Sequence, residues 1–95
     1  MNARVLFVDD EPSVLNGIRR RLDGVYEIAT ADSGEAGLEL IDSSGPYAVI
    51  VTDMRMPQMN GVQFIQHARM VAPDSAYIML TGNQDQATAI KALND

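Results

Sequence analysis

Short apolar runs alternate along this chain with longer stretches of helical period, and no other feature of the sequence constrains the fold as strongly. The apolar runs cover residues 5–8, 25–30, 48–51 and 76–80. Strands that alternate regularly with helices are typical of βαβ units, in which helices cover a parallel sheet. We therefore predict an α/β fold with a doubly wound parallel sheet in the strand order 2-1-3-4. The runs at 5–8 and 48–51 are apolar throughout and fit central strands, whereas the mixed run at 25–30 fits a strand nearer an edge.

Local signals set the expected ends of the helices between these strands. Each of the first three helices begins at a capping side chain or at a proline that fits the first turn, and ends at or before a glycine or proline. The resulting boundaries are Pro12 to Gly24 for the first helix, Ser33 to residues 43–46 for the second, Asn60 to Pro73 for the third, and about Gln84 to Leu93 for the fourth.

Composition places the chain among single globular domains. It has 95 residues, of which 46% are hydrophobic and 21% are charged, so one packed core is expected. A net charge of -6 argues against direct binding to nucleic acid or to anionic membranes. The absence of cysteine excludes disulfides and thiolate metal sites. No signal-peptide pattern is visible and no segment approaches the ~18 apolar residues of a membrane span, so a cytoplasmic protein is expected.

Acidic and hydroxyl side chains follow three of the predicted strands at the point where each strand ends. Asp9 and Asp10 follow the first strand, Asp53 follows the third, and Thr81 follows the fourth. In an open parallel sheet, ligands bind beyond the carboxyl ends of the strands, where the strand order reverses. If the first and third strands are neighbours, three carboxylates converge there, and their mutual repulsion calls for a cation. Ligands that are all oxygen suit a hard ion such as Mg²⁺.

A carboxylate in such a crevice is able to attack phosphorus, because a bound cation offsets the charge on the phosphoryl oxygens. Asp53 is the natural nucleophile, and the Thr81 hydroxyl is placed to donate to a phosphoryl oxygen. Each residue alone also has a structural explanation, with Asp10 as a helix cap, Asp53 as a turn residue and Thr81 as a loop residue. Their joint occurrence at successive strand ends favours a functional site. By contrast, His67 and the basic run at residues 19–21 are expected on solvated helix faces.

Three segments resemble the receiver domains of bacterial two-component response regulators. Val5–Glu11 carries the acidic pair after the first strand, and Leu80–Gly82 carries a Thr-Gly pair after the fourth. In Asp53–Gly61, a proline follows the aspartate by four residues and a glycine follows the proline by four. The resemblance covers all 95 residues. It implies a flavodoxin-like fold and a phosphorelay signalling domain that is not an enzyme in its own right.

The resemblance also implies a role for each residue of the crevice. Asp53 would accept a phosphoryl group from a sensor histidine kinase or a phosphotransfer protein. Asp10 and Asp53 would bind Mg²⁺ together with the backbone carbonyl of Arg55, while Asp9 would act largely through water. Thr81 would be the residue that switches position when the phosphoryl group arrives.

The sequence departs from the family pattern after the fourth strand. The family continues with a fifth strand, which ends in a lysine that pairs with the phosphoryl group, and with a fifth helix. Lys91 falls in the expected fourth helix and cannot replace that lysine, so we expect residues 1–95 to form a receiver domain that is incomplete at its C-terminal end. Such a domain would expose the edge of strand four, which favours a homodimer through Tyr77–Leu80 and helix four.

Two other functions stay open on the sequence alone. One is an interaction or dimerisation scaffold, derived from a receiver domain, that keeps the acidic crevice but no longer switches. The other is a Mg²⁺-dependent phosphatase with Asp53 as nucleophile, which is disfavoured because 95 residues leave little room for a substrate pocket.

Overall fold

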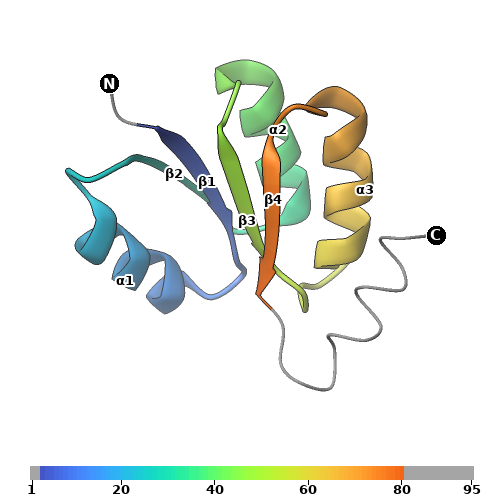
Figure 1. The fold of residues 1–95 in the computed structure, drawn as a ribbon. Coiled ribbons are helices and arrows are strands. Elements are labelled where there is room, and N and C mark those ends of the chain that lie inside the picture. The colour runs from blue at the N-terminus through green and yellow to red at the C-terminus, as the bar shows by residue number, and fades with distance from the viewer. Residues whose placement is uncertain (1–2, 81–95) are drawn as a thin grey trace.

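The computed structural model describes residues 3–80, which form strands and helices in strict alternation (Figure 1). Thr81, Lys91 and the predicted fourth helix lie outside the described residues. No helix within residues 3–80 has the length and apolar content needed to cross a membrane. The elements are β1 (Arg4–Val8), α1 (Pro12–Leu22), β2 (Glu27–Ala31), α2 (Gly34–Ser44), β3 (Val49–Asp53), α3 (Gly61–Val71) and β4 (Ala76–Leu80).

All four strands are parallel and lie in the order β2-β1-β3-β4. The predicted α/β class and strand order are therefore confirmed, and β2 is an edge strand as expected. β4 has the predicted bounds, whereas β3 covers residues 49–53 rather than 48–51. This longer β3 brings Asp53 itself into the sheet, where its backbone position is set by the register with Leu80 of β4.

The predicted start of β2 was wrong. Val25 and Tyr26 are 56% and 41% exposed and precede the strand, which begins at Glu27. Gly24 has a φ of 87°, a left-handed conformation that glycine adopts at little cost, and it turns the chain after α1. The backbone N–H groups of Val25 and Tyr26 then donate to Leu22 O, at 2.9 and 3.1 Å. These two residues therefore close the turn instead of extending the sheet.

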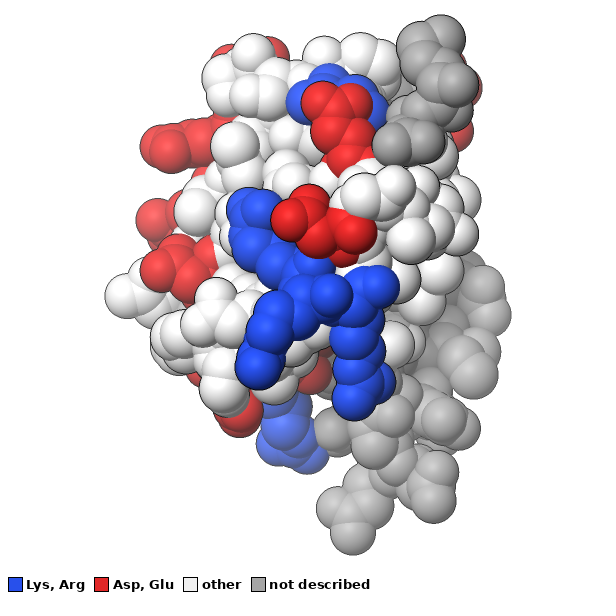
Figure 2. Space-filling model, turned by 90° about the vertical axis from the view of Figure 1, so that its left-hand side faces the viewer, with Lys and Arg blue, Asp and Glu red and all other residues white. Residues whose placement is uncertain are grey.

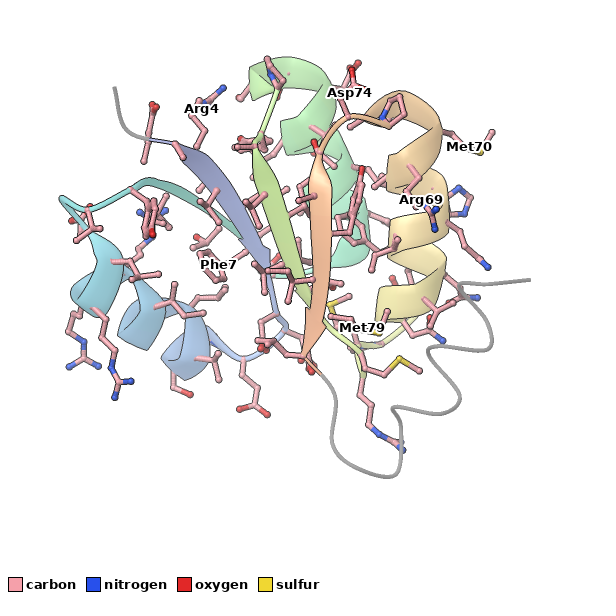
Figure 3. The ribbon with its side chains drawn as sticks, viewed as in Figure 1. Arg4, Phe7, Arg69, Met70, Asp74 and Met79 are labelled. Carbon is pink, nitrogen blue, oxygen red and sulfur yellow. The ribbon has the colours of Figure 1, made fainter. Side chains whose placement is uncertain are left out.

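The helices cover both faces of the sheet. Figure 1 shows α1 on one face and α2 and α3 side by side on the other. Side chains alternate between these faces along each strand, so that Phe7 of β1 points toward α1 while Met79 of β4 lies on the side of α3 (Figure 3). The main buried cluster lies between the sheet and the α2–α3 layer, and consists of Leu6, Val8, Ala31, Ile41, Tyr47, Ile50, Met56, Phe64, Ile65 and Ala68.

Side-chain caps fix the beginnings of α2 and α3, as predicted. Ser33 Oγ accepts a hydrogen bond from the Ala36 N–H at 3.0 Å. Asn60 and Gln63 form a reciprocal capping box, with hydrogen bonds of 2.9 and 3.0 Å between each side chain and the other residue's backbone N–H. At α1, the N-cap position is held by Glu11, which makes no side-chain cap. Asp10 therefore does not cap α1, which removes the structural explanation for this aspartate.

The basic run is exposed in the last turn of α1, as predicted, and comprises Arg19, Arg20 and Arg21. Figure 2 shows the basic side chains gathered on the face that includes α1. Cations at a helix C-terminus interact favourably with the helix dipole. The run lies about 12 Å along the helix from the first residue of α1, a distance greater than the Debye length of about 8 Å at physiological ionic strength. It therefore does not offset the acidic residues at the other end of α1.

The edge of β4 is apolar in the part of the chain that the structure describes. Ile78 and Leu80 are each 49% exposed and alternate with the half-buried Tyr77 and Met79. Exposed apolar edges favour pairing with another strand. The homodimer expected through Tyr77–Leu80 and helix four stays a prediction.

Candidate metal centre

Three acidic side chains lie together at the carboxyl ends of the two central strands. The parallel pairing of Val8 with Thr52 places the ends of β1 and β3 beside one another. Asp9, Asp10 and Asp53 each offer one carboxylate oxygen, and these atoms lie within 4.8 Å of one another. The arrangement follows from the strand order, because parallel neighbours end at the same edge of the sheet.

Backbone groups orient two of these carboxylates. Asp9 is 8% exposed, and its Oδ1 accepts a hydrogen bond of 2.9 Å from the Glu11 N–H. The Asp9 N–H donates in turn to Ala31 O at 3.1 Å, so that β2 also holds this residue in place. The backbone N–H groups of Met54 and Arg55 interact with the Asp53 carboxylate and lower its pKa. The Met54 N–H also donates to Leu80 O of β4 at 3.3 Å. The sequence did not reveal these donors, because every residue except proline carries the same backbone N–H.

The environment of Asp53 opposes its ionisation. Burial raises the pKa of the Asp53 carboxyl above its ordinary value of 3.8, and the negative charge of Asp9 raises it further. The N–H groups of Met54 and Arg55 lower this pKa through their hydrogen bonds, and the charge of Asp10 raises it by a smaller amount than that of Asp9. The ionised cluster therefore carries electrostatic strain that a cation would relieve.

The donors at this site fit a hard divalent cation. Carboxylate oxygens are the ligands that Mg²⁺ prefers in proteins, and three oxygens leave coordination positions for water. No cysteine exists in the chain and His67, the single histidine, is exposed on α3, so the donor set does not suit a softer metal. Separations of up to 4.8 Å between the three oxygen atoms allow one ion to lie among them after small side-chain rotations. The residues present therefore fit Mg²⁺.

Metal-free protein is expected to lose stability as the pH rises from about 3.8 through the raised pKa of Asp53. Over this range the folded state keeps a proton that the unfolded state has lost, so raising the pH favours unfolding. The measurement is urea unfolding in EDTA across this range for the wild type and for Asp53→Asn, since their difference isolates this carboxyl. Equal pH dependence in the two proteins would contradict the prediction. Saturating Mg²⁺ at neutral pH should restore the stability lost by the wild type.

The loop after Asp53 is closed by backbone contacts at both of its ends. The Gly61 N–H donates to Met54 O at 2.8 Å, and the Met59 N–H donates to Pro57 O at 2.7 Å. The latter bond closes a three-residue turn around Gln58, whose φ of 68° is rare for a residue other than glycine. Sequence reasoning missed this turn, because glutamine gives no signal for a positive φ.

A Cβ atom on Gly61 has no room in this arrangement. It would lie 3.0 Å from Met54 Cα and closer still to the backbone carbonyl oxygen of Asp53. The absence of a side chain therefore lets the start of α3 approach the end of β3. This close approach explains why glycine stands at the last position of the aspartate–proline–glycine motif.

The structure brings together most of the residues that the sequence singled out. The carboxylates of Asp9, Asp10 and Asp53 share one site, and the Arg55 backbone lies beside it, because its N–H donates to Asp53. Thr81 follows Leu80, the last residue of β4, in the sequence, and lies outside the described residues.

Comparisons with curated proteins relate this chain to regulators of several kinds. The hydrogenase transcriptional regulatory protein HoxA of Cupriavidus necator is 33% identical over 93 residues, which make up 98% of this chain and 19% of HoxA. The response regulator MprA of Mycolicibacterium vanbaalenii is 30% identical over 95 residues, which make up 99% of this chain and 41% of MprA. The chain thus spans between about a fifth and two fifths of the length of these relatives.

Solved structures and a family model give the same relationship. A chain described as adenylate cyclase from Rhodopirellula baltica superposes with a TM-score of 0.93 at 49% identity, over 99% of this chain and 70% of that one. The chemotaxis protein CheY4 of Vibrio cholerae gives a TM-score of 0.86 at 31% identity, over 98% of this chain and 81% of that one. The family model described as the response regulator receiver domain matches residues 5–95. The chain belongs to the response regulator receiver domain family.

Proposed function

We propose that this chain accepts a phosphoryl group on Asp53 in a two-component phosphorelay. The observation that carries the proposal is the set of three carboxylate oxygens within 4.8 Å of one another at the tips of adjacent parallel strands. In this proposal Asp10, Asp53 and the backbone carbonyl of Arg55 bind Mg²⁺, and Asp9 acts through a water molecule. When bound, the cation supplies positive charge that offsets the negative charge of the phosphoryl oxygens.

The Asp53 carboxylate is the nucleophile of the proposed reaction. One of its oxygens forms a bond to phosphorus while the bond from phosphorus to the donor's histidine nitrogen breaks. The electron pair of the broken bond remains on that nitrogen, which then takes a proton from solvent. The N–H groups of Met54 and Arg55 hold the carboxylate in place. The hydroxyl of Thr81, which follows Leu80 in the sequence, is proposed to donate to a phosphoryl oxygen.

A receiver of this kind takes its phosphoryl group from a sensor histidine kinase or a phosphotransfer protein. The relatives include transcriptional regulatory proteins, and one solved neighbour is described as an adenylate cyclase. The present chain matches only part of each of these proteins, and they are described by different activities. We therefore assign phosphoryl acceptance, and no particular output, to residues 1–95.

Incubation of the purified chain with acetyl phosphate and Mg²⁺ is expected to add the mass of one phosphoryl group. Intact-mass spectrometry detects the addition, and borohydride reduction followed by peptide mapping assigns it to the peptide that contains Asp53. EDTA should prevent the addition, because the acidic cluster then lacks the cation that offsets the incoming charge. A chain that gains no phosphoryl mass at any Mg²⁺ concentration, while folded, would instead be the scaffold considered above.

A further inference from the structure

The side chain of Met59 lies directly on the backbone of Gly34 at the start of α2. A Cβ atom on Gly34 would lie 2.6 Å from Met59 Sδ, 3.1 Å from its Cγ and 3.2 Å from its Cβ. Three consecutive atoms of Met59 therefore occupy the space above Gly34, and rotation of the terminal methyl group alone would not clear it. Gly34 is buried, and Met59 is half-buried and packed against the main core cluster, so core side chains limit how far Met59 can move away from Gly34.

Met59 belongs to the loop that carries the backbone of the candidate metal centre. It follows directly after the strained turn at Gln58, whose φ is 68°. Such a conformation persists only where surrounding contacts hold it. The Met59 side chain lies against Gly34 of α2, and the Met59 N–H donates to Pro57 O at 2.7 Å. The contact between the Met59 side chain and Gly34, called the seat of Met59 below, therefore holds the turn at Gln58 from outside the loop.

The same loop ends at the groups that touch Asp53. Its first two residues, Met54 and Arg55, donate backbone N–H groups to the Asp53 carboxylate. Its far end is tied back to its beginning by the bond of 2.8 Å from the Gly61 N–H to Met54 O. A displacement of Met59 therefore moves the rest of this short closed loop, including the backbone N–H groups of Met54 and Arg55 beside Asp53. No side chain of α2 needs to reach the site for this transmission.

We propose that Gly34 is a positioning residue for the metal centre, and that it acts through the seat it offers to Met59. Any side chain at position 34 displaces Met59, shifts the loop at residues 54–60 and misplaces the backbone of Arg55. The inference rests on the proposed function, because it assigns to α2 a part in building the same Mg²⁺ site. It differs from ordinary core packing, which predicts a loss of stability but no change in cation affinity of the folded protein.

The test compares two glycine substitutions that differ in the space around them. Gly34→Ala adds a methyl group against Met59, whereas a Cβ atom on Gly17 of α1 would meet no heavy atom within 4 Å. Titration calorimetry with Mg²⁺ is carried out at a temperature where urea unfolding shows each variant to be folded. Gly34→Ala is expected to raise the Mg²⁺ dissociation constant about tenfold, as does the loss of other groups that orient metal ligands. Gly17→Ala should leave it unchanged.

A double-mutant cycle tests whether Gly34 affects Mg²⁺ binding through Met59. Met59→Ala removes the seated side chain and is expected to weaken Mg²⁺ binding by a similar factor. The double variant should bind Mg²⁺ no more weakly than the single variant with the lower affinity, because both substitutions break the same contact. Should Gly34→Ala not fold, Met59→Ala still reports on the seat, since it adds no atom to the core.

Three results would overturn the inference. The first is a Gly34→Ala or Met59→Ala protein that is less stable but binds Mg²⁺ as the wild type does. The second is a double variant whose Mg²⁺ dissociation constant rises by the product of the two single-variant factors, which would mean that the two residues act independently. The third is a wild type that binds no Mg²⁺, and this result alone would also reject the proposed function.

Discussion

The Asp53→Asn variant is expected to gain no phosphoryl mass from acetyl phosphate and Mg²⁺, and to be more stable than the wild type in EDTA. The amide has nearly the shape of the carboxylate but lacks an anionic oxygen that attacks phosphorus. In the folded state, burial and the charges of Asp9 and Asp10 disfavour the ionised form of Asp53. A neutral residue relieves this repulsion, which should raise the free energy of unfolding by about 1 kcal/mol.

Asp74→Asn is the matched control for the loss of one negative charge. Asp74 lies in the turn before β4, at the end of the sheet away from the carboxylates (Figure 3). This variant should accept a phosphoryl group at the rate of the wild type, and its free energy of unfolding should change by less than about 0.5 kcal/mol. A phosphoryl group found on the Asp53→Asn protein would show that another residue is the acceptor.

Gly61→Ala is expected to combine a loss of stability with a much slower gain of phosphoryl mass. The added methyl group would lie 3.0 Å from Met54 Cα and against the Asp53 carbonyl, so α3 must move away from the end of β3. Forcing extra atoms into packed backbone costs about 2 kcal/mol. The shift moves the backbone that holds the nucleophile, and a displacement of about 1 Å is able to slow a positioned reaction about a hundredfold.

Urea unfolding and a time course of intact mass measure these two effects separately. The time course is run at low temperature, where the variant remains folded, so that unfolding does not account for the slower reaction. Gly17→Ala again serves as control, since its position in α1 is open, and there alanine should stabilise the helix by up to about 1 kcal/mol. A Gly61→Ala protein with wild-type kinetics would show that the close approach of α3 does not position Asp53.

Sequence patterns were sufficient for the architecture because the central strands of a parallel sheet are buried on both faces. β1 and β3 therefore appear as unbroken apolar runs, and two of the helices, α2 and α3, carry recognisable caps at Ser33 and Asn60. The start of β2 was misplaced because Val25 and Tyr26 are typical strand residues by composition. They are excluded from the sheet by the turn at Gly24. The residue types of Val25 and Tyr26 do not show how far that turn extends.

The site was accessible from sequence only where its residues lie at the carboxyl end of a strand, either as its last residue or just after it. Asp9, Asp10 and Asp53 have this position, so the strand order was enough to bring them together. The positive φ of Gln58 could not be predicted, because the conformation is imposed by contacts rather than by the residue type. The contact between Gly34 and Met59 also escaped, since it depends on how closely α2 and the loop before α3 pack in three dimensions.

The pairing of Val8 with Thr52 has a consequence for how this domain tolerates changes in length. Side chains alternate across a strand, so removing one residue inside β3 would turn its terminal aspartate toward the opposite layer. The shortened chain would still have an apolar strand, yet its acidic groups would no longer meet. Insertions and deletions among homologues should therefore accumulate in the turns at the far end of the sheet, such as the one at Pro46, and spare the strand interiors.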